Sequence, residues 1–74
     1  MSKEEIYDMI KRACGERRRA KFFPYAISFP DLKILSNESD ESLKPQINAL
    51  FKEKRIKFYR NVNRIVFLYI DEYF

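Results

Sequence analysis

The sequence predicts a single α+β domain over residues 1–74, with three helices, a short strand and a C-terminal β-hairpin. The chain has the length of one domain. Apolar residues recur at helical spacing in three segments, and two strand-like segments joined by a short polar turn follow them. Apolar residues make up 46% of the chain and aromatic residues 16%, which is typical of a packed domain and excludes a disordered one.

The first helix is predicted over residues 3–14. Ser2 and Glu5 form the S-x-x-E pattern of a capping box at its start. Gly15 is expected to follow its last residue, because glycine takes the left-handed conformation that closes many helices at little cost. One apolar stripe is expected to face the core and comprises Ile6, Met9, Ile10, Ala13 and Cys14.

A short strand is predicted at residues 25–27, and a second helix over residues 29–35. Ser28 lies directly before this helix and is its expected N-cap. Leu32 and Leu35 are three residues apart, a spacing that indicates a helix.

The third helix is predicted to begin between residues 40 and 43 and to end near residue 54. Pro45 must lie in its first turn, where the missing N–H group is not needed. The apolar face of this helix is expected to comprise Leu43, Ile47, Leu50 and Phe51.

Residues 56–60 and 64–70 are predicted to form the hairpin, with residues 61–63 as its turn. The second strand is apolar on both faces, which favours a central position in the sheet. Asparagine tolerates positive φ, so the Asn-Val-Asn turn needs no glycine. Side chains alternate between the two faces of a strand, so Phe58 is predicted to be buried and Tyr59 exposed. An exposed Tyr59 would either stack on a nucleic-acid base or cover a helix.

The aromatic residues are expected mainly in the core, with a second group at the C-terminus. A homodimer is expected to form through either the first helix or this C-terminal group, because aromatic residues are enriched in interfaces. This group comprises Tyr69, Tyr73 and Phe74. The expected core residues are Phe22, Phe23, Phe29, Phe51, Phe58 and Phe67.

The composition excludes several classes of catalytic site. The chain has no histidine, one glycine and one cysteine, so it lacks a thiol–imidazole pair, a histidine-based metal site, a glycine-rich phosphate loop and an internal disulfide. We therefore expect no enzyme activity, no cofactor and no metal. The first ten residues lack the apolar run of a signal peptide, and no run approaches the roughly 20 residues of a membrane span. These features predict a cytoplasmic, nucleoid or nuclear protein that is not secreted.

Positive charge is concentrated in residues 44–64, which carry seven cations and one acid within a chain of net charge +4. At 100° per residue, Lys44, Asn48, Lys52 and Arg55 fall opposite the apolar face of the third helix, with no acid among them. The alternative explanation for these cations is that they only keep the exposed face of the third helix soluble. A surface that serves only solubility, however, carries charges of both signs.

The order of helix, short strand, helix, helix and hairpin resembles the winged helix-turn-helix family. Two segments carry the resemblance, AISFPDLKILS at residues 26–36 and LKPQINALFKEKRIKFYRN at residues 43–61. The family usually has a glycine between the third helix and the first wing strand, where this chain has Lys54 or Arg55.

The resemblance implies a small DNA-binding protein, either a transcriptional regulator or a replication or phage accessory factor, with double-stranded DNA as its partner. In the family the third helix enters the major groove, and the wing contacts the minor groove or the phosphates. Asparagine and arginine are also the residue types that pair with adenine and guanine. The implied DNA contacts are Lys44, Asn48, Lys52, Arg55, Lys57, Arg60, Asn61, Asn63 and Arg64.

Further alternatives remain open at the level of sequence. Ser39 and Ser42 either meet a phosphate or cap the third helix, and capping is favoured. Shape-directed RNA binding, or a protein–protein interaction module within a larger complex, would account for the same fold. A second basic cluster is either a further phosphate contact or a solvated helix end. This cluster comprises Arg17, Arg18, Arg19 and Lys21.

Overall fold

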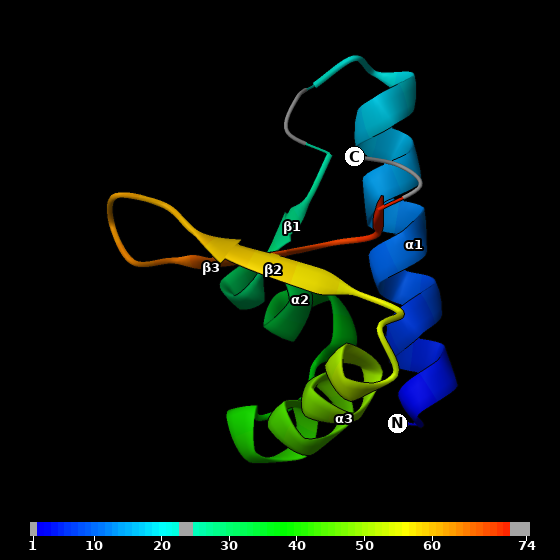
Figure 1. Ribbon diagram of the computed structural model, residues 1–74, viewed down its shortest axis with the longest axis vertical. Coiled ribbons are helices and arrows are strands. Elements are labelled where there is room, and N and C mark those ends of the chain that lie inside the picture. The colour runs from blue at the N-terminus through cyan, green and yellow to red at the C-terminus, as the bar shows by residue number, and fades with distance from the viewer. Residues whose placement is uncertain (1, 23–24, 72–74) are drawn as a thin grey trace.

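A computed structural model describes residues 2–22 and 25–71 and shows three helices and a three-stranded antiparallel sheet (Figure 1). The predicted α+β class and the predicted order of elements are confirmed. Within the described residues, no helix has the length and the apolar composition that a membrane span requires. The elements are α1 (Lys3–Arg19), β1 (Ile27–Ser28), α2 (Phe29–Ser36), α3 (Asp40–Lys52), β2 (Lys57–Arg60) and β3 (Val66–Tyr69).

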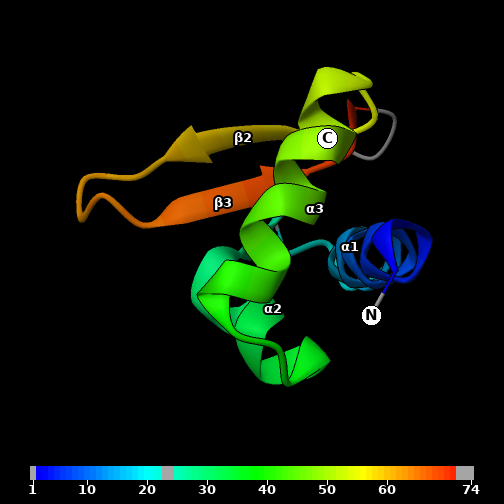
Figure 2. The ribbon, with the colours of Figure 1, turned by 90° about the horizontal axis from the view of Figure 1, so that it is seen from below.

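The sheet has the strand order β1-β3-β2, so β3 lies in the centre, as its two apolar faces predict. Leu68 of β3 is paired with Ile27 of β1 on one side and with Phe58 of β2 on the other. The β2–β3 hairpin projects away from the three helices (Figures 1 and 2). The sheet is therefore packed against the helices at one end and open to solvent at the other.

The core of the described residues is almost entirely aliphatic. The stripe predicted on α1 is confirmed, since Ile6, Ile10 and Cys14 are fully buried and Met9 packs against the core. Helix α1 packs on α3, α2 and β3, which gathers the buried side chains of all elements in one cluster. Its members are Ile6, Ile10, Ala13, Cys14, Ile27, Leu32, Leu43, Leu50, Ile56, Leu68 and Ile70.

Several aromatic residues predicted in the core lie at the surface instead. The side chains of Phe22, Phe51 and Phe58 are 70%, 44% and 45% exposed, and those of Phe29 and Phe67 are half-buried. A domain of this length buries only about 60% of the surface that its unfolded chain exposes, so aliphatic side chains fill the small interior and the larger rings remain at its edges.

Helix α1 continues past Gly15, where the sequence predicts its end. Gly15 has helical neighbours on both sides, and a Cβ added there would meet nothing within 4 Å. The helix closes with Lys21 in the left-handed conformation at φ 58°. The N–H group of Phe22 donates to the carbonyl of Arg17 at 2.8 Å and that of Lys21 to Arg18 at 3.1 Å. This is a Schellman motif, formed here by lysine in place of glycine.

Helix α3 ends in the same way, two residues before the predicted end. Lys54 has a φ of 61° and donates its N–H group to the carbonyl of Phe51 at 3.0 Å, and Arg55 donates to Leu50 at 3.0 Å. Of the two residues expected between the third helix and the first hairpin strand, Lys54 and Arg55, it is Lys54 that takes the left-handed conformation. The reversal brings Ile56 into the core, where it is 2% exposed, and directs the chain into β2.

The two predicted caps at the beginnings of α1 and α2 are confirmed. The Ser2 hydroxyl accepts from the N–H group of Glu5 at 3.3 Å, and the Glu5 carboxylate accepts from that of Ser2 at 3.2 Å. The Ser28 hydroxyl accepts from the N–H group of Asp31 at 3.2 Å. The short strand begins two residues and ends one residue later than predicted, and because Ser28 is its last residue it leads directly into α2.

The hairpin turn differs from the prediction in the residue that takes positive φ. Arg64, at 62°, holds that conformation, and its N–H group donates to the carbonyl of Asn61 at 2.9 Å. The Asn61 side-chain oxygen accepts from the N–H groups of Asn63 at 2.9 Å and Ile65 at 3.0 Å. The loop is thus longer than predicted, and β3 begins at Val66.

The position of Gly15 predicts that Gly15→Ala stabilises the protein. Glycine in a helix interior costs about 0.5–1 kcal/mol relative to alanine, and the new methyl group meets no neighbour. The free energy of unfolding should rise by this amount, which thermal denaturation followed by circular dichroism would detect as an increase in Tm of several degrees. Lys11→Ala, at an exposed site of the same helix, is the control, and an unchanged or lower Tm for Gly15→Ala would refute the prediction.

The positive φ of Lys54 predicts that Lys54→Gly stabilises the protein by up to about 1 kcal/mol. Lysine pays a free-energy cost for its left-handed conformation, and glycine does not. This gain in stability is larger than the loss caused by the greater conformational entropy of glycine in the unfolded chain. Urea denaturation should show a higher midpoint with an unchanged m-value. Lys11→Gly in the interior of α1 should lower the midpoint, and a lower midpoint for both variants would contradict this account.

Candidate functional site

A groove of about 290 Å³ lies between α3 and the β2–β3 hairpin. Its lining combines apolar side chains with two cations and an amide, a mixture that suits a ligand with both charged and flat apolar parts. The lining residues are Phe29, Lys44, Ile47, Asn48, Phe58, Arg60, Val66 and Leu68.

The hairpin contributes one wall of the groove through its pairing register. Phe58 lies opposite Leu68 and Arg60 opposite Val66, so these four side chains share the face of the sheet that is turned toward α3. Leu68 is buried, whereas Phe58 is exposed because β2 is an edge strand. The ring of Phe58 packs against that of Phe51 from α3, with centroids 4.9 Å apart.

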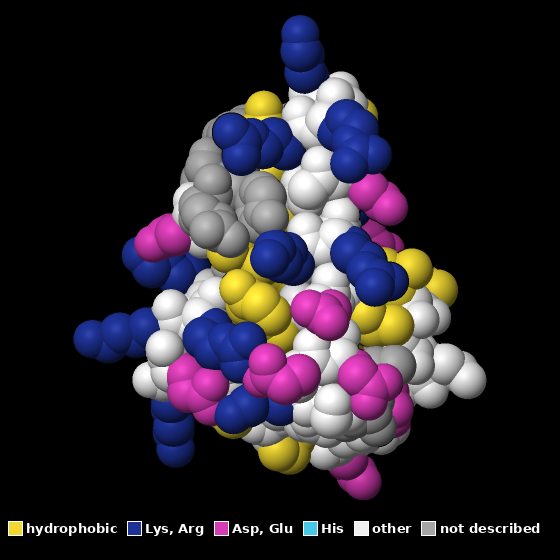
Figure 3. Space-filling view, turned by 90° about the vertical axis from the view of Figure 1, so that its right-hand side faces the viewer, with side chains coloured by type: hydrophobic (Ala, Val, Ile, Leu, Met, Phe, Trp, Pro, Cys, Tyr) yellow, Lys and Arg dark blue, Asp and Glu magenta, His cyan; other side chains and the backbone are white. Residues whose placement is uncertain are grey.

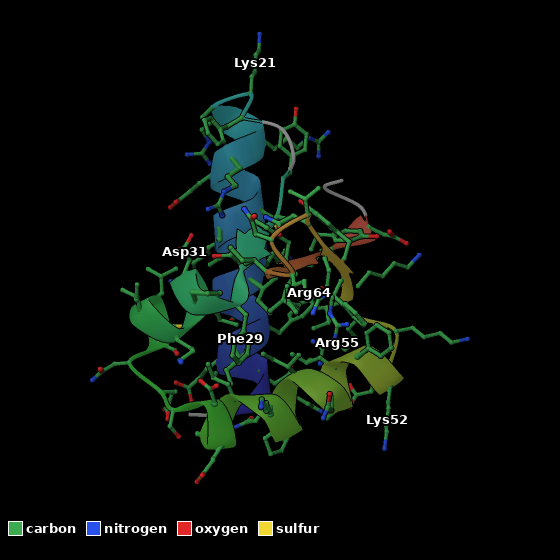
Figure 4. The ribbon with its side chains drawn as sticks, turned by 90° about the vertical axis from the view of Figure 1, so that its left-hand side faces the viewer. Lys21, Phe29, Asp31, Lys52, Arg55 and Arg64 are labelled. Carbon is green, nitrogen blue, oxygen red and sulfur yellow. The ribbon has the colours of Figure 1, made fainter. Side chains whose placement is uncertain are left out.

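Helix α3 contributes the other wall. Lys44 and Asn48 are one helical turn apart and exposed, and Ile47 beside them is half-buried. Lys52 lies one turn further, at the end of α3, where its side chain extends outward from the molecule (Figure 4). Arg64 lies in the hairpin loop (Figure 4). The structure thus arranges Lys44, Asn48 and Arg60 around one groove, with Lys52 and Arg64 at the ends of its two walls.

Arg55, which the sequence places among the DNA contacts, belongs to an ion-pair network with α1. Its guanidinium donates to the Glu4 carboxylate at 2.5 and 2.9 Å, lies 3.6 Å from the Glu53 carboxylate and covers the Tyr7 ring at 4.1 Å. Lys3 also pairs with Glu53. We call these five residues the α1 clamp. The hydrogen bond from Arg55 lowers the pKa of Glu4, and that from Lys3 lowers the pKa of Glu53.

Lys57 is likewise engaged away from the groove. Its ammonium lies 2.6 Å from the Asp71 carboxylate, and this hydrogen bond raises the pKa of Lys57. Lys57 lies opposite Tyr69 in the sheet register, on the face that does not line the groove.

Four cations around the groove have no ion-pair partner within the described part of the chain. We call them the α3–hairpin cations, and they are Lys44, Lys52, Arg60 and Arg64. All four side chains are exposed. Glu53, which follows Lys52 directly in the sequence, is held in the α1 clamp. An uncompensated set of cations on two walls of one groove is an arrangement that favours an anionic ligand.

The N-terminus of α3 has the opposite character. Asp40 and Glu41 lie in the first turn, and Asp40 pairs with Lys33 at 2.5 Å, which lowers the pKa of Asp40. The Ser39 hydroxyl accepts from the N–H group of Ser42 at 3.2 Å, and the Ser42 hydroxyl donates to the Glu38 carboxylate at 3.0 Å. The capping interpretation of Ser39 is therefore confirmed, and acids surround this helix end.

The face of the hairpin turned away from the groove is aromatic, which corrects the prediction that Tyr59 is exposed. Tyr59 is half-buried and stacks on Phe67 at 5.3 Å, and Tyr69 lies 5.9 Å from it. Burial raises the pKa of Tyr59. The predictions for Phe23, Tyr73 and Phe74 fall outside the described residues.

The second basic cluster lies far from the groove. Lys21 and Lys52 appear at opposite ends of the molecule, whose longest extent is 31 Å (Figure 4). Arg17 in this cluster lies 3.8 Å from the Asp31 carboxylate. The structure therefore does not bring the cluster and α3 together on one wall, and a second phosphate contact at Arg17, Arg18, Arg19 and Lys21 stays a prediction.

Comparisons with protein-family models, with curated proteins and with solved structures find no match for this chain. Within the described residues, no group of three or more histidine, cysteine, aspartate or glutamate side chains is arranged to hold a metal ion. The geometry and charge of the groove therefore carry the functional argument.

The α1 clamp predicts a pH-dependent contribution to stability. Glu4 and Glu53 have pKa values below their ordinary 4.5 in the folded protein, so they bind protons less readily there than in the unfolded chain. Their stabilisation is present above pH 4.5 and is lost as the pH falls through the lowered folded values. Glu4→Gln should therefore lower Tm by a few degrees at pH 7 and by less at pH 3, because protonation of Glu4 weakens the ion pair as the pH falls.

The control for this prediction is Asp8→Asn on the exposed side of α1, since Asp8 has no ion pair within the described residues. This variant should have a similar Tm to the parent protein at both pH values. An equal decrease in Tm for Glu4→Gln at pH 3 and pH 7 would show that the clamp does not act through charge.

Proposed function

We propose that the protein is a winged-helix DNA-binding protein, a transcriptional regulator or a replication or phage accessory factor, that contacts duplex DNA through α3 and the β2–β3 wing. The observation that carries this proposal is the charge distribution around the groove. Arg55 and Lys57 are neutralised by acids, whereas the four α3–hairpin cations around the groove have no ion-pair partner in the described chain. Lysine and arginine that protrude without partners are suited to bind phosphates.

The arrangement of elements supports the same proposal. The short strand between the first two helices, β1, pairs with β3 of the hairpin and thereby joins the wing to the helices. The hairpin projects beside α3, so both elements can contact one duplex (Figure 2). Asn48 on the exposed face of α3 is suited to bond an adenine edge in the major groove.

The tip of the hairpin has the chemistry of a minor-groove contact. Val62 is 97% exposed at this tip, with Asn63 and Arg64 directly after it. Apolar side chains that protrude among polar and cationic ones enter the minor groove in many architectural proteins, and arginine favours narrow minor grooves.

The acids at the beginning of α3 restrict the docking geometry. Asp40 and Glu41 repel phosphates, so the DNA backbone is expected to approach the second half of α3 and the wing. This places the contact between Lys52 and Arg60, with Lys44 nearer its edge.

DNA binding is tested by fluorescence anisotropy with a labelled mixed-sequence duplex at several salt concentrations. If the four α3–hairpin cations each neutralise one phosphate, the log–log slope of affinity against salt should be about −3.6. The double variant Lys52→Glu/Arg60→Glu should weaken binding at least about tenfold and make the slope less steep by about two.

The matched control is Lys11→Glu/Arg12→Glu, which changes net charge by the same amount at exposed sites of α1. Its affinity and salt slope should stay close to those of the parent protein. The proposal fails if the folded parent protein does not bind the duplex at low salt, or if the two double variants weaken binding equally.

A second function, as a protein-interaction module, is favoured by a separate observation. Phe22, Ile34 and Leu35 are 70%, 77% and 58% exposed, and all three line a cleft on the opposite side of α2 from the groove. Large exposed apolar side chains that lie close together mark interaction surfaces.

A further inference from the structure

The cleft between α1 and α2 is lined by Phe22, Ile34 and Leu35, whose exposed fractions exceed those of all other large apolar side chains of the described residues except Val62. It has a volume of about 540 Å³ and opens along the C-terminal half of α1. A smaller hollow of about 210 Å³ continues it toward Met9, and Ala13, Glu16 and Leu35 line both. From Met9 to the end of α1 at Arg19 the two hollows follow the helix for about 15 Å, the length of nearly three helical turns.

The composition of α2 explains why this cleft remains apolar. Leu32 is fully buried on the core side of α2, whereas Leu35 is 58% exposed and Ile34 is 77% exposed. A helix with apolar side chains on two sides needs partners on both. The core supplies one partner, and Ile34 and Leu35 form the lip of the cleft on the other.

Small side chains make the floor of the cleft accessible. Ala13 and Ala20 lie on the α1 wall, seven residues and about two helical turns apart, with Ile27 of β1 between the helices. The absence of bulk at these two alanines lets the apolar side chains of an incoming segment approach the backbone of α1. Phe22 closes the upper end of the cleft.

The charges around the cleft determine what kind of segment fits it. Arg17 and Asp31, which line the cleft, pair with each other at 3.8 Å. Arg12 and Arg19 are also seven residues apart, so they project within about 20° of each other from the flank of α1 beside Glu16. Neither has an ion pair within the described residues. One edge of the cleft therefore carries two exposed cations spaced by two helical turns.

The space-filling view of the α1 side of the molecule shows how basic and acidic side chains are distributed there (Figure 3). Basic side chains outnumber acidic ones in the upper half of this face, while the lower half mixes both signs (Figure 3). An apolar patch borders this face on the side of α2 (Figure 3). Residues 11–22 carry six cations and a single acid.

We propose that the α1–α2 cleft binds an acidic amphipathic helix of a partner protein. The apolar face of this helix lies on Ala13, Ala20 and Ile34, and acidic side chains seven residues apart pair with Arg12 and Arg19. Charge complementarity selects this occupant over a second copy of the chain, since a second copy would bring the same basic segment to the interface.

The proposal is tested with a fluorescein-labelled peptide of about 16 residues that has leucine at positions i, i+3, i+4, i+7 and i+11 and glutamate and alanine elsewhere. Binding is measured by anisotropy, and the binding site by amide chemical-shift changes in ¹⁵N-labelled protein. The peptide should bind with shifts centred on Ala13, Ala20 and Ile34. A scrambled peptide of identical composition should bind at least about tenfold more weakly.

Two variants separate the apolar and charged parts of the site. Ile34→Asp and Arg12→Glu/Arg19→Glu, all at exposed positions, should each weaken peptide binding at least about tenfold without loss of the folded circular-dichroism spectrum. Lys52→Glu/Arg60→Glu should bind the peptide like the parent protein, so the result is independent of the DNA proposal.

Four outcomes would overturn the proposal. The first is no peptide binding at low salt, and the second is equal binding of the scrambled peptide, which would indicate charge attraction alone. The third is a set of chemical shifts on the hairpin in place of α1 and α2. The fourth is a parent protein that sediments as a dimer which Ile34→Asp dissociates, since this would assign the cleft to a second copy of the chain.

Discussion

The position of β3 between β1 and β2, with α1 packed across it, is the constraint on which the rest of the molecule depends. Leu68 is 1% exposed and is paired on both sides, so it fixes β1 and β2 relative to each other and to the core. Ile6 and Ile10 of α1 fill the space beside it. A chain this short offers few buried positions, and aliphatic side chains occupy them, so its larger rings line the edges of the core and form the walls of hollows.

The α1 clamp connects the packing of α1 with the distribution of charge on the surface. Arg55 follows the left-handed Lys54, and the Schellman motif directs it toward Glu4 and Tyr7 of α1. The clamp thereby holds the junction of α3 and β2 against α1, and the same contacts remove Glu53 from the groove side of α3. With Arg55 and Glu53 held in the clamp, the four α3–hairpin cations have no acidic partner within the described residues, an arrangement that favours phosphate binding.

The sequence predicts the elements of this fold better than it predicts which faces are covered. Capping chemistry is local, so the starts of α1 and α2 follow from Ser2 and Ser28, and the apolar run of β3 is sufficient to place it centrally. Periodicity shows that Phe58 shares a face with Leu68, but only the edge position of β2 explains its exposure. The partner of Arg55 lies 51 residues away, a tertiary contact that spacing on the third helix does not reveal.

Helix α2 lies between the α3–hairpin groove and the α1–α2 cleft and contributes side chains to both. Phe29, its first residue, lines the groove beside α3, while Ile34 and Leu35 near its other end line the cleft against α1. The helix is only eight residues long and is fixed by one fully buried leucine and by the cap at Ser28. A ligand that moves α2 toward α1 would therefore also move Phe29 within the groove. If the two hollows bind DNA and an acidic helix, their affinities are coupled through this helix, and by linkage each ligand changes the affinity for the other by the same factor.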